Sequence, residues 1–134
     1  MARTTLGIVA GLAAWVAITS VAGVIMRGAW PQYASVADAM TFTLPMLCAR
    51  LAIGAVATLA AGFIAAVIAR ESLVATLMPG ALLLVAFIPV HITLWDKFPL
   101  WYHLTFLVSL VPLTYAGGKL TEASARQIAG SRER

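Results

Sequence analysis

Long apolar runs without a charged side chain are the feature that most constrains this chain. Residues 6–26, 73–95 and 98–118 contain no Asp, Glu, Lys or Arg. A membrane-spanning α-helix needs about 20 such residues, because hydrocarbon offers the backbone no hydrogen-bond partner. Only 10% of the 134 residues are charged, against roughly 25% in soluble domains. The sequence therefore predicts an all-α integral membrane protein.

Four spans are expected in a single membrane domain, residues 1–134. The start of the second span has two interpretations, because a semi-polar stretch containing Pro45 precedes its apolar run. We interpret that stretch as an interfacial helix or a helical lead-in, bent near Pro45. Gly117 and Gly118 predict the end of the last span. The expected elements are residues 6–26, a lead-in at 38–46, and then 47–69, 73–95, 98–118 and a tail at 119–134.

The first apolar run has a second interpretation. Arg3 gives a basic start and Ser20, Val21 and Ala22 resemble a cleavage site, as in a secretory signal peptide. The length of the run favours a retained helix. After it, residues 27–37 are expected to form a break, with Trp30 and Tyr33 in a loop at the level of the lipid headgroups.

The basic residues predict an orientation. The positive-inside rule places the side with more Lys and Arg in the cytoplasm. We therefore expect both termini inside and the turn near residue 96 outside, in a bacterial inner membrane. The net charge of +4 is too dispersed to indicate nucleic-acid binding. The inner side would hold Arg3, Arg70, Lys119, Arg126, Arg132 and Arg134, and the outer side Arg27 and Lys97.

Small residues at helical spacing predict where the spans pack. Helices in lipid associate where small side chains let their backbones approach. Thr58 is expected to bond a neighbouring helix or its own backbone, and Ser109 and Thr114 to bond carbonyls one turn back. Ser72 is a plausible N-cap of the third span. The packing faces would be Gly7, Gly11 and Ala14 on the first span and Gly54, Ala57, Thr58, Ala61, Gly62 and Ala65 on the second.

Polar and aromatic residues gather at one end of the predicted bundle. His91 and His103 bracket the connection between the last two spans, so they are expected to face each other. Arg50 lies on the small-residue stripe of the second span and would share their layer or extend to the headgroups. Interfacial anchoring remains the simpler interpretation. The candidate ligand-binding residues are Arg50, His91, His103, Trp95, Trp101, Tyr102, Asp96 and Asp38.

The sequence favours a binding protein over an enzyme. It contains no nucleophile elbow, Gly-rich phosphate loop or Cys–His cluster, and Cys48 is its one cysteine. We expect it to bind a lipid, another hydrophobic ligand or a partner membrane protein at the aromatic–histidine end. Two alternatives stay open. One is an electron-transfer accessory that binds haem b, a metal ion or a quinone through His91 and His103; the other is a transporter or channel formed by homo-oligomers.

Overall fold

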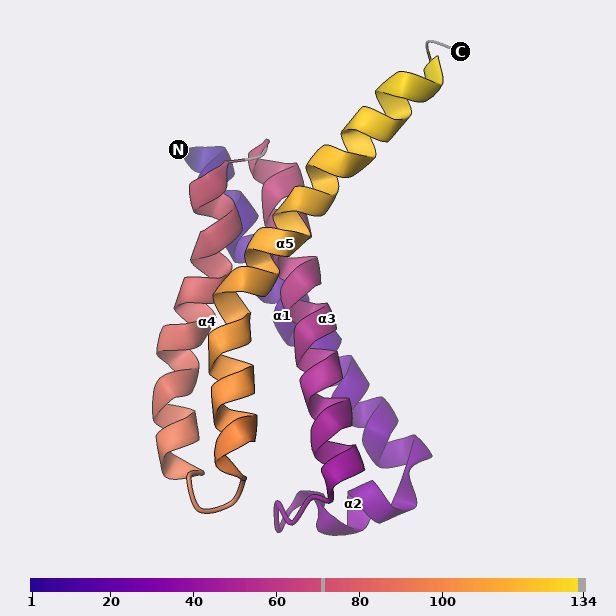
Figure 1. Cartoon of the computed structure of the whole chain (residues 1–134), viewed down its shortest axis with the longest axis vertical. Helices are drawn as coiled ribbons and strands as arrows, with labels where there is room; N and C mark the ends of the chain where they lie inside the picture. The colour runs from indigo at the N-terminus through magenta and orange to yellow at the C-terminus, as the bar shows by residue number, and fades with distance from the viewer. Residues whose placement is uncertain (71, 133–134) are drawn as a thin grey trace.

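The chain folds as a bundle of five α-helices (Figure 1), seen in a computed structural model that describes residues 1–70 and 72–132. No strand occurs within those ranges. The helices are α1 (Ala2–Ala29), α2 (Pro31–Ala37), α3 (Leu44–Ala69), α4 (Leu73–Thr93) and α5 (Leu100–Arg132). Among the described residues, α1, α3 and α4 are long and apolar enough to cross a membrane. The protein is therefore membrane-embedded.

The termini of the helices lie at two opposite ends of the bundle. One end holds the N-terminus, the end of α3 and the start of α4 (Figure 1). The other end, called here the α2 end, holds α2, the start of α3 and the connection between α4 and α5. Toward the α2 end, the α4–α5 pair diverges from α3, whereas the second half of α5 projects past the opposite end.

The loop expected at residues 27–37 is largely helical. α1 continues to Ala29, and after Trp30 the chain begins α2 with Pro31 in its first turn. A proline is tolerated there because the first N–H groups of a helix have no partner within the helix. The lead-in expected at residues 38–46 is a turn and an extended segment, and α3 begins at Leu44. Pro45 therefore starts the helix and does not bend it.

The glycine pair expected to end the last span does not end α5. The helix runs through Gly117 and Gly118 to Arg132. A Cβ on Gly117 would collide with the carbonyl group of Leu59, and one on Gly118 with the side chain of Thr76. These glycines allow α5 to cross its neighbouring helices at close range. Any side chain larger than hydrogen at these positions would collide with those helices.

The small-residue faces pack as predicted. Gly7 and Gly11 of α1 lie against α3, where an added Cβ would come within 2.7 Å of the carbonyl oxygens of Ala65 and Ala61, respectively. Thr58 accepts a hydrogen bond from the indole N–H of Trp15 at 3.1 Å and donates one to Gly54 at 2.7 Å. The backbone bonds of Ser109 and Thr114 are also confirmed, as is the cap by Ser72.

Candidate functional site

Arg50 is the charged group around which the α2 end is arranged. It lies six residues after the first residue of α3, which is about 9 Å along the helix axis. Its Nη1 donates a hydrogen bond to the hydroxyl of Tyr33 at 2.7 Å, and its Nε donates one to the hydroxyl of Tyr102 at 3.4 Å. Its guanidinium carbon stands 4.7 Å from the ring centre of Phe42. Three aromatic side chains from different parts of the chain therefore hold this cation.

No carboxylate neutralises Arg50 in the part of the chain that the structure describes. The ion pair found there joins Arg27 to Asp38 at 3.1 Å, at the exposed surface. A phenol accepts a hydrogen bond but carries no negative charge at neutral pH. A charged side chain within a membrane-spanning helix is costly and is retained chiefly where it has a function. Arg50 therefore marks a candidate binding site.

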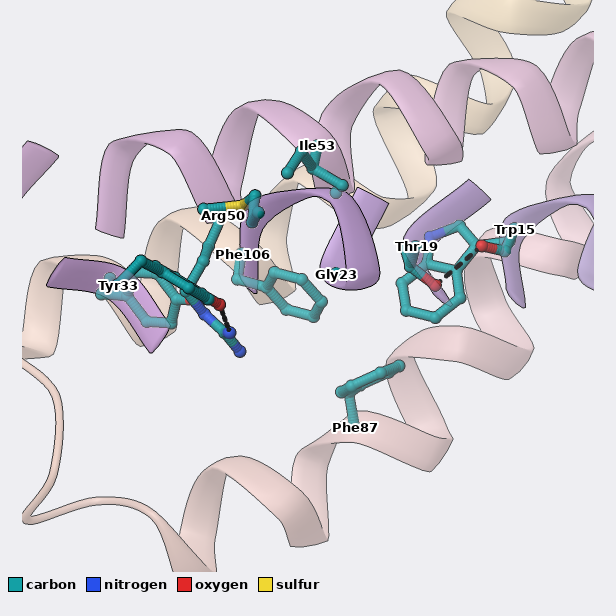
Figure 2. A pocket seen from close by; sticks show the side chains of 11 residues that line it. Trp15, Thr19, Gly23, Tyr33, Arg50, Ile53, Phe87 and Phe106 are labelled. Carbon is teal, nitrogen blue, oxygen red and sulfur yellow. Dashed lines mark hydrogen bonds between the residues drawn. The ribbon is translucent and has the colours of Figure 1, made fainter. Parts of the chain in front are cut away.

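A cavity of about 220 Å³ adjoins the Arg50 guanidinium. Figure 2 shows Arg50 and Tyr33 at one end of it and Trp15 and Thr19 at the other, with Phe87 of α4 facing them. All five helices contribute to its wall. Most of the remaining lining is apolar, so the cavity combines one cation with a hydrocarbon-like interior. That combination is suited to an amphiphilic molecule.

The two histidines form a direct pair beside this cavity. The Nδ1 atoms of His91 and His103 are 2.7 Å apart. The Nε2 of His103 lies 3.2 Å from the carbonyl oxygen of Phe98 and 3.4 Å from that of Trp95. Because carbonyl oxygens only accept, Nε2 of His103 carries the hydrogen. A His103 ring with its hydrogen on Nε2 accepts at Nδ1, and His91 then donates to it from its own Nδ1.

The short distance between the two histidines does not match binding of one metal ion by both rings. Two nitrogens bound to one tetrahedral zinc ion at 2.0–2.1 Å would stand about 3.3 Å apart, farther than the 2.7 Å between the two Nδ1 atoms. Both ring nitrogens of His103 are already used in hydrogen bonds. The described residues contain no group of three or more potential metal ligands. Ligation by both histidines would require the pair to separate, and it stays a prediction from the sequence.

Tyr102 connects the histidine pair to Arg50. Its hydroxyl accepts from Arg50, while its ring stacks on His91 with a centroid distance of 6.2 Å. Phe106 stacks on the same imidazole at 4.9 Å and also lines the cavity. The histidines therefore support the cavity wall from behind, where they fix the two aromatic rings that face the cavity. Their position makes them positioning residues for the site.

The structure brings together five of the eight candidate residues. Trp95 joins the group by stacking on His103 at 4.9 Å. Asp38 lies apart, paired with Arg27 at the surface, and Asp96 is exposed in the turn before α5. Trp101 is 40% exposed and touches Tyr102 only by its edge. The residues brought together are Arg50, His91, His103, Trp95 and Tyr102.

Several residues of the site were not among the candidates predicted from the sequence. Tyr33, expected as a headgroup anchor, is only 4% exposed and directs its hydroxyl to Arg50. Phe42 stacks between Tyr33 and Phe98. The sequence does contain a signal for these contacts, since an unpaired arginine within an apolar run needs polar or aromatic partners. It contains no signal that selects Tyr33 from the other aromatic residues.

Comparisons of the chain with protein-family models, with curated protein sequences and with solved structures find no match. Function is therefore inferred from the geometry of the α2 end.

Proposed function

We propose that this protein is a non-enzymatic, four-span membrane protein that binds a lipid or another hydrophobic ligand in the Arg50 cavity. One observation supports the proposal above all. A guanidinium group without an acidic partner in the described chain faces a largely apolar cavity inside a membrane-embedded bundle. A ligand with a polar head and an apolar body would contact both kinds of surface at once.

The fourth span in this proposal is the first half of α5. This half carries Trp101, Tyr102 and His103 among its apolar residues, which makes it less hydrophobic than α1, α3 and α4. It packs against α3 and α4 along the bundle, and a fourth span would return the chain to the side where it began. We propose a bacterial inner membrane, both termini in the cytoplasm and the α2 end outside, on the distribution of Lys and Arg.

A substitution at Gly23 can test whether the cavity holds the ligand. This glycine of α1 lines the cavity, and an added Cβ would meet no atom within 4 Å. Gly23→Leu is expected to fill the ligand space without disturbing a packed contact. Gly28→Leu is the matched control, because Gly28 lies in the same helix with equally open surroundings and outside the cavity.

The measurement is the number and mass of lipid or other small-molecule adducts that the purified protein retains, read by native mass spectrometry from mild detergent. Wild type and Gly28→Leu are expected to retain the same adduct, and Gly23→Leu is expected to lose it. Equal adducts on wild type and Gly23→Leu would show that the ligand, if any, lies elsewhere. Wild-type protein without any adduct would count against the proposal as well.

A further inference from the structure

We infer that the ligand of this cavity is a single-chain amphiphile with a carboxylate head. This inference rests on the proposed function and adds the chemical class of the ligand. Its basis is a cluster of free hydrogen-bond donors at one end of the cavity, together with side-chain donors at the other end that are already used within the protein.

The Arg50 end of the cavity offers donors and little else. A guanidinium has five N–H groups and accepts nothing. Arg50 gives two of them to Tyr33 and Tyr102, which leaves three without a partner in the described chain. Each phenol oxygen that accepts from Arg50 keeps its own O–H to donate. A ligand group that only accepts hydrogen bonds and carries negative charge fits this end.

The far end of the cavity offers no free side-chain hydrogen-bond donor to a polar ligand. The hydroxyl of Thr19 donates to the carbonyl of Trp15 at 2.9 Å, within α1. The indole N–H of Trp15 donates to the hydroxyl of Thr58 at 3.1 Å. The wall between the two ends includes Ile53 and Phe87. This part of the cavity therefore takes hydrocarbon.

The size of the cavity favours one chain. A volume of about 220 Å³ lies below the range of roughly 300–1,000 Å³ that is typical of drug-sized pockets. The head group and the first part of one chain fit there, with the remainder of the chain extending into the bilayer. A second acyl chain on the same head group would have to lie outside the cavity.

Charge favours a carboxylate over a phosphate monoester. A carboxylate carries one negative charge, which balances the single charge of Arg50. A phosphate monoester carries about −1.5 to −2 at neutral pH, and no second cation contacts the head-group end of the cavity in the described residues. The two oxygens of a carboxylate also match the planar fork of a guanidinium.

The test uses photolabelling of the full-length protein in phosphatidylcholine nanodiscs. The probes are hexadecanoic acid carrying a diazirine in its chain, its methyl ester, the amine of the same chain length, and a lysophosphatidic acid with the same label. Mass spectrometry maps the labelled residues. We expect the acid to label the cavity wall about tenfold more than the ester or the amine, because charge-assisted hydrogen bonds distinguish the head groups.

Two variants separate the inference from the function on which it rests. Arg50→Gln is expected to reduce labelling by the acid to the level of the ester, and Gly23→Leu to abolish cavity labelling by every probe, with Gly28→Leu as the unchanged control. Equal labelling of wild type by acid, ester and amine, blocked by Gly23→Leu, would overturn the carboxylate and leave the proposed function standing. Preferential labelling by lysophosphatidic acid would overturn it in the same way.

Labelling that Gly23→Leu leaves unchanged would overturn both proposals. The comparison among the four probes on wild-type protein needs no variant, so the carboxylate inference remains testable even if Arg50→Gln does not fold.

Discussion

The Nδ1 atoms of His91 and His103 lie 2.7 Å apart and join the end of α4 to the first turn of α5. A hydrogen bond between two imidazoles requires one ring to donate and the other to accept. The carbonyl oxygens of Phe98 and Trp95 lie within hydrogen-bond distance of Nε2 of His103. Because a carbonyl oxygen only accepts, Nε2 of His103 is the donor, which leaves its Nδ1 as the acceptor from His91. This geometry fits one tautomer of the pair, with a hydrogen on Nε2 of His103 and on Nδ1 of His91.

The tautomer of the histidine pair is the first prediction. In protein labelled with ¹⁵N-histidine, NMR at neutral pH is expected to show a protonated Nε2 on His103 and a protonated Nδ1 on His91. The His91→Asn and His103→Asn variants assign the two sets of signals. A neutral His103 with its hydrogen on Nδ1 would contradict the geometry, since the carbonyl oxygens at its Nε2 would then lack a donor.

Tyr33→Phe is expected to destabilise the protein by about 1.5–3 kcal/mol, the range for hydrogen bonds to charged groups. It removes the acceptor that lies 2.7 Å from Arg50 and changes no ring packing. Tyr102→Phe is the matched comparison, because its ring is equally buried and its bond to Arg50 is longer, at 3.4 Å. We expect a smaller loss there. The measurement is the free energy of unfolding in a detergent titration, and equal losses would disprove the ranking.

Gly117→Ala is expected to destabilise the bundle by about 1–3 kcal/mol, the usual cost of overpacking. The new methyl group would collide with the backbone of Leu59, which cannot move as a side chain does. Gly28→Ala is the control. It meets open space and is expected to be neutral or stabilising by up to about 1 kcal/mol, from helix propensity. Thermal unfolding in detergent compares the two variants, and similar melting temperatures would refute the close crossing of α3 and α5.

The proposed topology predicts which positions an impermeant maleimide reaches in intact cells. In a Cys48→Ser background, Lys97→Cys lies in the exposed turn before α5 and is expected to react from outside. Ser124→Cys, on the projecting half of α5, is expected to react only after the membrane is permeabilised. The reverse pattern would invert the orientation, and external reaction at both positions would remove α5 as a span.

Local patterns in the sequence predicted local features well. The cap by Ser72, the backbone bonds of Thr114 and the buried small-residue face of α3 each depend on neighbours within about one turn or on helical periodicity. The same local reasoning was wrong at Gly117 and Gly118. A glycine pair favours a helix end in isolation, yet here the contact between α5 and its neighbours keeps the helix continuous.

The sequence by itself determined that the chain is all-helical and lies in lipid. Uncharged runs of about 20 residues indicate helices in lipid. An α-helix satisfies all of its backbone hydrogen bonds within one segment, which hydrocarbon requires. The sequence also placed the two histidines together, since a short connection forces them into adjoining turns. The tertiary structure alone decided the partners of Arg50. Tyr33 is 17 residues away from it in the chain and Tyr102 is 52, and periodicity within one helix contains no information about which distant ring closes on it.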